Sequence, residues 1–258
     1  METIKIIKIG GNVIDDPMEL KAFLRLFSNV KGMKILVHGG GKSATKLAQK
    51  MQVNVNMVDG RRITDSSMLN IVTMVFAGEI NKKIVAQLQQ FKCNSIGFSG
   101  ADGNTIISEK RPVKKIDYGF VGDVKKVNIE VLKTLLAQGI TPVFCAITHD
   151  EKGQLLNTNA DTIAAELAIA FASQFKTVLY YCFEKNGVLE DVDNENSVIQ
   201  QIDTNTYRML IKNNIISAGM LPKLNNCFQA VEHKVTKVCI GKPSMLNNLN
   251  TNYTTIKL

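Results

Sequence analysis

Two apolar runs near the N-terminus each end in clustered glycines, and this feature restricts most strongly what the chain can fold into. The run IKIIKI leads into Gly10 and Gly11, and the run MKILVH leads into Gly39, Gly40 and Gly41. Glycines between a strand and a helix let backbone N–H groups approach an anion closely, and the helix adds its positive end. The two loops therefore predict that the chain binds phosphate at two places.

The spacing of these glycines argues against the two commonest nucleotide-binding motifs. Neither loop matches G-x-x-x-x-G-K-[ST] or G-x-G-x-x-G, so P-loop and Rossmann sites are not indicated. A single loop of this kind would be interpreted as a tight turn without a ligand. Two such loops around Lys8 favour a ligand, and Lys8 becomes the first catalytic candidate. His38 is expected to pack, or to bond the backbone, at its strand end.

The composition is that of an ordinary globular protein. With 258 residues, 45% of them hydrophobic, the chain can bury a sizeable core as one large α/β domain or as two lobes. Its longest apolar stretches fall well short of the roughly 18 residues that span a bilayer, and its N-terminus lacks a signal-peptide pattern. We therefore expect a cytoplasmic protein that has no membrane contact.

The cysteines and the net charge exclude further classes of site. The five cysteines are odd in number, lack C-x-x-C spacing and lie mostly in apolar runs, so buried free thiols are expected rather than disulfides or zinc ligands. The formal net charge is +8, but the lysines are dispersed and aromatic residues make up only 6%. Nucleic acid is therefore not an expected partner, and the basic surface suits anionic nucleotides and carboxylates.

Strand-like runs alternate with helical patterns along most of the chain, which predicts an α/β fold with buried parallel strands and helices on both faces. The helical run over 66–91 covers about seven turns and is a candidate dimer helix. A lobe boundary is expected near Ala172 and Ser173. The predicted strands are 4–9, 33–38, 93–100, 141–147, 176–183 and 236–241, with hairpins over 104–127 and a polar loop and strand over 247–255; the predicted helices are 17–30, 43–51, 66–91, 129–139, 157–173, 203–214 and 220–233.

Six separated motifs point to one enzyme superfamily. They are KIGGN (8–12), HGGGK (38–42), GRRIT (60–64), NTNAD (157–161), NGVL (186–189) and SAGMLPK (217–223). Together they resemble the amino acid kinase superfamily and, within it, the N-acetylglutamate kinase family of arginine biosynthesis. The resemblance implies an open, mainly parallel αβα sandwich, with an acyl-amino-acid-binding and dimerising lobe over 1–172 and a nucleotide-binding lobe over 173–258. It also implies ATP-dependent phosphorylation of the γ-carboxylate of an N-acylated glutamate, first of all N-acetyl-L-glutamate, to an acyl phosphate.

Transfer of a phosphoryl group to a carboxylate brings two anions together, so such a site must supply positive charge. By resemblance, Lys8 and Lys223 stabilise the transferring group from two sides, and Asp161 orients both ammonium groups. Either lysine alone would be interpreted as a surface residue. Arg62 is expected to clamp the α-carboxylate of the substrate, with a surface salt bridge as the alternative, and Arg61 is expected to face solvent.

The remaining predicted site residues belong to a substrate side and a nucleotide side. Asn157 offers an amide suited to the acylamido group, and Asn159 is expected either to contact the ligand or to cap the following helix. Gly40 and Gly41 complete the substrate side. No carboxylate cage for a metal is expected, since Mg²⁺ commonly binds through nucleotide phosphates and water. The predicted nucleotide side consists of Gly10, Gly11, Glu184, Gly187, Leu189, Ser217 and Gly219.

One segment departs from the family, whose nucleotide loop is similar to L-x-D-V-x-G-V. Here Glu184 replaces the aspartate and Lys185 replaces an apolar residue, so the contacts to adenosine are implied less firmly than those to phosphate. The acyl group also stays open, because no motif residue separates acetyl from a longer group such as succinyl. Further alternatives are a sibling kinase with another substrate, and a non-catalytic ligand sensor, against which the retained charged residues argue.

The resemblance also bears on assembly. Arginine-inhibited relatives carry an extra N-terminal helix that links dimers into a hexameric ring, whereas here the first strand starts by about Ile4. A homodimer that is insensitive to arginine is therefore expected, with the helix over 66–91 as its two-fold contact. The alternative is that this helix packs only within its own chain.

Overall fold

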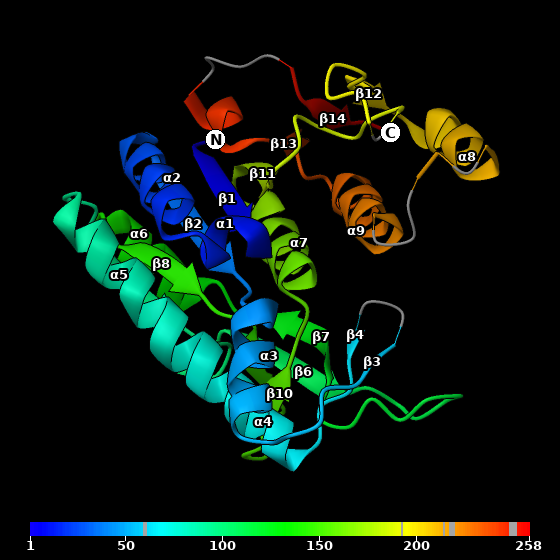
Figure 1. Ribbon diagram of the computed structural model, residues 1–258. Coiled ribbons are helices and arrows are strands. Elements are labelled where there is room, and N and C mark those ends of the chain that lie inside the picture. Colours follow the sequence, from blue (N-terminus) through cyan, green and yellow to red (C-terminus); the bar gives the residue numbers. More distant parts are fainter. Residues whose placement is uncertain (59–60, 192, 214, 217–219, 248–251) are drawn as a thin grey trace.

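The computed structural model describes all residues except 59–60, 192, 214, 217–219 and 248–251. Within the described residues, an eight-stranded sheet in the order β12-β14-β13-β11-β1-β2-β8-β5 forms the centre of the molecule (Figure 1). All its strand pairs are parallel except β13 with β14, so the predicted mainly parallel sheet is confirmed. The strands are β1 (Thr3–Ile9), β2 (Met33–His38), β5 (Ser95–Phe98), β8 (Thr141–Phe144), β11 (Lys176–Cys182), β12 (Gln201–Ile202), β13 (Lys237–Gly241) and β14 (Thr254–Ile256).

Helices cover both faces of this sheet, as the alternating pattern predicts. In Figure 1, α2 (Pro17–Asn29) and α5 (Asn81–Gln90) lie on one side, and α7 (Ala160–Ala172) and α9 (Leu221–Glu232) lie on the other. The start of α2 shows how local sequence sets an element, because the Asp16 carboxylate accepts hydrogen bonds from two backbone N–H groups and Pro17 opens the first turn. The other helices are α1 (Gly11–Asp15), α3 (Gly41–Lys50), α4 (Ser66–Thr73), α6 (Glu130–Ala137) and α8 (Thr204–Lys212), with short 3-10 segments at Asp102–Asn104 and Pro243–Asn247.

The long helix predicted over 66–91 is present, but its middle is wider than an α-helix. Between α4 and α5 the residues Met74–Ile80 form a π-helix, which the apolar spacing did not predict. The apolar side chains of the three segments are mostly buried within their own chain, and only Met74 is a large exposed apolar side chain on them. These side chains therefore pack within their own chain, and the two-fold contact through this helix stays a prediction.

A second, four-stranded sheet has the order β10-β9-β6-β7. Its β6 (Ile106–Lys110) and β7 (Gly122–Val127) are the predicted hairpin over 104–127. The prediction of one strand over 141–147 is wrong, because the chain bends at Cys145 and Ala146 and passes from β8 into β9 (Ile147–His149). Likewise the helix predicted from 157 begins only at Ala160, since Asn157 ends β10 (Leu155–Asn157). A small hairpin pairs β3 (Met57–Val58) with β4 (Arg61–Arg62).

The predicted lobe boundary coincides with the loop between α7 and β11, and the central sheet contains strands from both sides of it. The division into two lobes stays a prediction. All five cysteines are buried and free, as expected. Among the described residues, no helix is both long and apolar enough to cross a membrane.

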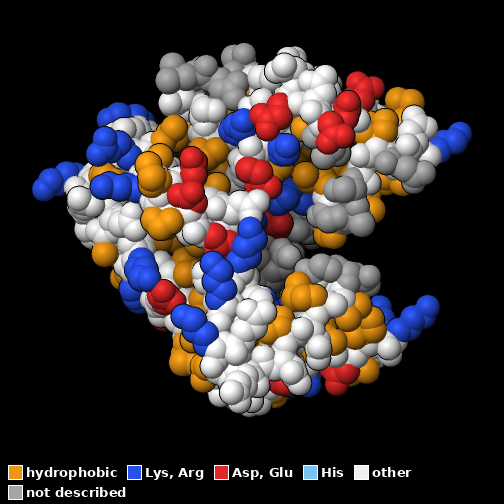
Figure 2. Space-filling model, viewed as in Figure 1, with side chains coloured by type: hydrophobic (Ala, Val, Ile, Leu, Met, Phe, Trp, Pro, Cys, Tyr) orange, Lys and Arg blue, Asp and Glu red, His pale blue; other side chains and the backbone are white. Residues whose placement is uncertain are grey.

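The carboxyl ends of three central strands create the place for a site. In β1, Lys8 lies opposite Val37 of β2 and Tyr181 of β11, so these strands end side by side. Loops that leave adjacent parallel strands toward opposite faces open a crevice at this end of a sheet, where ligands bind. Figure 2 shows the surface deeply hollowed between the part that carries α8 and α9 and the part that carries β3 and β4.

Candidate active site

Asp161 binds two lysines that are far apart in sequence. Its Oδ1 lies 2.6 Å from the Lys8 ammonium nitrogen, and its Oδ2 lies 2.8 Å from that of Lys223. All three side chains are largely buried, with 11% of Lys8, 14% of Lys223 and 17% of Asp161 exposed. The predicted catalytic triplet is thus brought together as one ion cluster.

The backbone places each member of this cluster. Lys8 stands near the end of the central strand β1, and Asp161 lies in the first turn of α7, where the Asn159 side chain caps the helix by accepting from the N–H groups of Asp161 and Thr162. The hydroxyl of Tyr181 donates to the Asp161 carbonyl over 2.8 Å. The Lys223 ammonium, near the start of α9, lies 4.9 Å from the centre of that tyrosine ring.

The charges within the cluster support one another. Burial by itself disfavours the Asp161 carboxylate, but Lys223 and Lys8 outweigh this and hold its pKa well below the usual range. Burial lowers the pKa of Lys8, while the attraction of Asp161 opposes that shift. With both carboxylate oxygens engaged and a low pKa, Asp161 is a poor proton acceptor, so its role is to hold the two cations in place.

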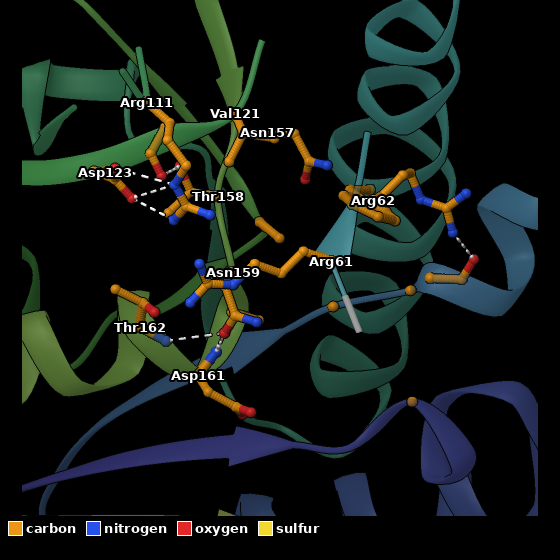
Figure 3. A pocket seen from close by; sticks show the side chains of 18 of the residues that line it. Arg61, Arg62, Arg111, Val121, Asp123, Asn157, Thr158, Asn159, Asp161 and Thr162 are labelled. Atoms are coloured by element: carbon orange, nitrogen blue, oxygen red, sulfur yellow. Dashed lines mark hydrogen bonds and ion pairs between the residues drawn. The ribbon is translucent and has the colours of Figure 1, made fainter. Parts of the chain in front are cut away.

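A cavity of about 270 Å³ opens in front of Lys8 and Asp161 (Figure 3). Predicted substrate residues from three separate segments of the chain meet in it. Its described lining is Lys8, Gly11, Gly39, Gly40, Gly41, Met57, Arg61, Arg62, Phe76, Arg111, Val121, Gly122, Asp123, Ala146, Asn157, Thr158, Asn159, Ala160, Asp161 and Thr162.

Arg62 forms one wall of the cavity and is only 9% exposed. One of its terminal nitrogens donates to the Gly41 carbonyl over 2.9 Å and to the Thr45 hydroxyl over 2.8 Å, which anchors the guanidinium against the start of α3. The guanidinium has no carboxylate partner among the described residues, so the alternative of a surface salt bridge is wrong. Its position in the cavity wall suits a substrate carboxylate.

The glycine loops have different roles in the structure. Gly40 has a φ of +151°, and an added Cβ would lie 2.3 Å from the Ile80 side chain, so only glycine fits there without strain. The N-terminus of α3, which follows Gly40, has no side-chain cap. Gly10 differs from the prediction, because its N–H already donates to the Cys182 carbonyl over 2.8 Å and is not free for phosphate. Gly11 and Gly41 line the cavity.

The two predicted asparagines both line the cavity. The amide of Asn157 donates to the Thr64 hydroxyl over 3.0 Å, which fixes its orientation. Asn159 is the helix cap, as one of its two expected roles required. Because it also lines the cavity, contact with a ligand stays a prediction.

The predicted nucleotide residues are not gathered in this cavity. Glu184 is exposed and lines a separate groove beside Asn12 and Lys242. Leu189 is buried in the protein, and Gly187 packs so closely against Thr254 that a Cβ would lie 2.6 Å from its hydroxyl oxygen. Both positions therefore have a packing role, and nucleotide contact stays a prediction. Ser217 and Gly219 lie outside the described residues.

Sequence reasoning missed part of the cavity wall. Arg61, expected to face solvent, is exposed but lines the cavity. Arg111 at the end of β6 pairs with Asp123 on β7, with its Nε 3.1 Å from each carboxylate oxygen. The sequence offered one signal for this ion pair, the hairpin predicted over 104–127. A hairpin brings its two strands together but does not reveal that the ion pair faces the cavity.

Comparison with known proteins shows what this chain is similar to. The family model for the amino acid kinase family matches residues 3–242. A relative from Cytophaga hutchinsonii named acetylglutamate kinase is 52% identical over 256 residues, which covers 98% of this chain and 97% of the relative. The solved structure of smu.665 from Streptococcus mutans has a TM-score of 0.79 at 27% identity and 98% coverage of both chains. Carbamate kinase from Giardia lamblia, solved with AMP-PNP, shares the fold with a TM-score of 0.69 at 13% identity, covering 99% of this chain and 98% of that one.

Proposed function

Because this chain belongs to the amino acid kinase family, we propose that it is an acetylglutamate kinase that transfers the γ-phosphoryl group of ATP to the γ-carboxylate of an N-acylated glutamate. The product is an acyl phosphate, and the reaction belongs to arginine biosynthesis. Relatives at about half identity over nearly the whole chain carry the name acetylglutamate kinase, so N-acetyl-L-glutamate is the first substrate to test.

The observation that carries the proposal is the pairing of Lys8 and Lys223 with one carboxylate. A carboxylate substrate is already ionised at neutral pH, so it needs no general base to become a nucleophile. It needs cations that offset the charge of two approaching anions. Asp161 holds two ammonium groups, and the cavity beside them contains Arg62, which has no carboxylate partner among the described residues. Together these groups provide this arrangement.

The proposed reaction is a single in-line displacement. Arg62 holds the α-carboxylate of the substrate, which directs its γ-carboxylate toward Lys8. A γ-carboxylate oxygen forms a bond to the γ-phosphorus while the bond from that phosphorus to the bridging oxygen of ADP breaks. Lys8 stabilises the transferring group from the side of the acceptor, and Lys223 from the side of the nucleotide.

The residues present also suit Mg²⁺ that enters with the nucleotide. Among the described residues, no three His, Cys, Asp or Glu side chains gather into a metal site, and both oxygens of Asp161 are engaged by lysines. Nucleotide phosphates and water would therefore hold the ion. When bound, it neutralises charge on the β- and γ-phosphates.

The direct test adds ATP, Mg²⁺ and N-acetyl-L-glutamate to the purified chain and measures ADP together with acyl phosphate trapped as a hydroxamate. We expect the two products in equal amounts, and the Lys8→Met variant should form neither at a comparable rate. If the chain binds the acyl glutamate and ATP, as a rise in melting temperature would show, but releases no ADP, it is a sensor and the proposal fails.

We further propose that the protein acts as a homodimer in the cytoplasm. The five buried free cysteines suit a reducing compartment. At one end of the central sheet, the edge strand β5 exposes Ile96, and α5 packs against this strand. The π-helix that precedes α5 exposes Met74. These two exposed apolar side chains support a two-fold contact through the helix over 66–91 and the edge strand beside its C-terminal part.

A further inference from the structure

His38 and Asn81 form a buried polar pair that the proposed reaction does not use. His38 is 0% exposed and Asn81 is 1% exposed. Nε2 of His38 lies 3.1 Å from the Asn81 amide nitrogen, and Nδ1 lies 2.9 Å from the Gly39 carbonyl oxygen. Both bonds form when the imidazole carries its proton on Nδ1 and accepts at Nε2. Two apolar side chains could fill the same space without these bonds, so the pair is best explained by its effect on Gly39.

The bond from His38 sets the direction of the peptide unit between Gly39 and Gly40. In a trans peptide unit, the carbonyl and the following N–H point in opposite directions. Because the Gly39 carbonyl turns inward to His38, the Gly40 N–H points away from the imidazole, and Gly40 itself lines the cavity. Among the described residues, none accepts a hydrogen bond from this N–H. It is therefore available to a ligand.

The loop that carries this N–H lies at the end of the strand beside Lys8. Ile9 and His38 are partners in the parallel pairing of β1 with β2, so the two glycine loops leave adjacent strands at the same level. Lys8 and Gly40 line one cavity. A backbone N–H that is aimed in advance at developing negative charge stabilises a transition state. The Gly40 N–H has the position for this task.

The π-helix over Met74–Ile80 supports the same loop from a second side. A Cβ built at Gly40 would lie 2.3 Å from the Ile80 side chain and 3.1 Å from Phe76. In a continuous α-helix, Asn81 would point about 100° away from Ile80. Here the Asn81 N–H donates to the Phe76 carbonyl, and this wider turn places residue 81 over residue 76. The π-helix thus directs Asn81 to His38 while Phe76 and Ile80 pack against Gly40.

We propose that Asn81 and His38 are positioning residues that fix the peptide between Gly39 and Gly40, so that the Gly40 N–H donates to the transferring phosphoryl group. This inference rests on the proposed function, in which that group passes beside Lys8. Asn81 holds the ring and its tautomer, and the ring holds the Gly39 carbonyl. Neither side chain contacts the substrate. Their loss should therefore lower kcat more than it raises KM.

Two substitutions at position 38 separate the two bonds of the imidazole. His38→Asn keeps a side-chain N–H near the position of Nδ1 but loses the acceptor for Asn81, whereas His38→Gln keeps an acceptor near the position of Nε2 but loses the donor to Gly39. With N-acetyl-L-glutamate and ATP, His38→Gln should lower kcat by about 10-fold or more and change each KM by less than about threefold. His38→Asn should lower kcat by only about two- to threefold. Equal kcat values in the two variants, or the reverse order, would overturn the inference.

Lys34→Met is the matched control for lost stability. Lys34 lies on the same strand as His38, is 6% exposed and donates to three backbone carbonyls at the end of α2. Its substitution breaks a buried polar network far from the glycine loop, so the free energy of unfolding should decrease while kcat stays at the wild-type value. A loss of kcat in this variant equal to that in His38→Gln would mean that lost stability explains both.

A measurement on the wild-type protein tests the same N–H without a substitution. In protein labelled with ¹⁵N-glycine, the Gly40 amide proton should shift downfield when ADP, Mg²⁺, aluminium fluoride and N-acetyl-L-glutamate are added together, because aluminium fluoride takes the place of the transferring phosphoryl group. An unchanged Gly40 resonance in the loaded protein would contradict the inference and leave the kinase activity intact. The proposed function fails separately, if the wild-type protein forms no ADP and acyl phosphate.

Discussion

The side-chain amide of Asn81 donates a hydrogen bond to Nε2 of His38 over 3.1 Å, deep in the protein beside the second glycine loop. The same amide nitrogen donates to the Val143 carbonyl over 2.9 Å, which establishes it as the donor. Nε2 is therefore the acceptor, and the proton of His38 resides on Nδ1, 2.9 Å from the Gly39 carbonyl. The expected backbone bond of His38 is confirmed, and it ties the strand end to the loop.

This arrangement predicts that stability depends on pH through His38. Burial lowers the pKa of His38 to about 4, whereas the unfolded chain binds the proton near pH 6.5. Between these values the unfolded state holds more protons, so the free energy of unfolding should decrease as pH falls from about 6.5 to about 4, by at most roughly 1.4 kcal/mol per pH unit. Urea unfolding at a series of pH values measures this slope, and the His38→Gln variant should lack this part of it. Equal slopes in the two proteins would contradict the prediction.

Removal of either lysine of the ion cluster should affect turnover more than binding. In Lys8→Met and Lys223→Met the side-chain volume is largely kept, but one charge that stabilises the transferring phosphoryl group is lost. We expect kcat to fall by about 10² or more in each variant, with a smaller change in KM. Steady-state kinetics with the acyl glutamate and ATP measure both. Lys50→Met, which removes an exposed charge at the end of α3, should behave as wild type, and near-normal turnover in a cluster variant would remove that lysine from the mechanism.

Replacement of Arg62 should produce the opposite pattern. A lysine cannot hold the Gly41 carbonyl and the Thr45 hydroxyl while also presenting two parallel donors to a carboxylate. Arg62→Lys should therefore raise KM for the acyl glutamate by about 10- to 100-fold and leave KM for ATP nearly unchanged. Thr45→Val, which removes one anchor but keeps the guanidinium, should have a clearly smaller effect. An unchanged KM in Arg62→Lys would place Arg62 outside the substrate contacts.

The homodimer can be tested at Met74, the exposed methionine of the π-helix. A charge at this position would be buried without a partner in a two-fold contact, so Met74→Glu should shift the mass in light scattering from twice 28.5 kDa toward 28.5 kDa. Met209→Glu places the same charge at an exposed methionine of α8, on a distant part of the molecule, and should keep the wild-type mass. A wild-type protein with the mass of one chain would refute the dimer.

The sequence predicts regular elements well where one pattern persists over several turns or a whole strand. The spacing of apolar residues places the helix over 66–91, and the isoleucine-rich run places β1, because each pattern is dictated by burial. The sequence does not reveal the bend at Cys145 and Ala146, because the apolar run continues through these two residues. There the backbone N–H of Cys145 bonds the Phe98 carbonyl, a partner 47 positions earlier in the chain.

The candidate site depends even more on contacts between distant segments. Nothing in the local sequence around Lys223 distinguishes it from a surface lysine, and only the resemblance connects it with Asp161, 62 positions away. Arg61 and Arg62 show a further limit of prediction from sequence. Alternation along a strand indicates that their side chains point in opposite directions, but it does not indicate which of the two points into a cavity. Here both residues line it, since β4 forms part of its wall.

The final prediction concerns Gly40, whose backbone and surroundings both require glycine. In Gly40→Ala the new methyl group would lie 2.3 Å from the Ile80 side chain and 3.1 Å from Phe76, and a φ of +151° strains any residue with a Cβ. We expect the free energy of unfolding to decrease by about 2 kcal/mol or more, and kcat/KM to fall because the start of α3 moves in the cavity.

Gly78→Ala is the matched control, because Gly78 lies in the π-helix with nothing within 4 Å of the added Cβ. That variant should be stabilised by about 0.5 to 1 kcal/mol and keep its activity. If urea unfolding gives the two variants equal stability, the close approach of Ile80 and Phe76 does not exclude a side chain at position 40.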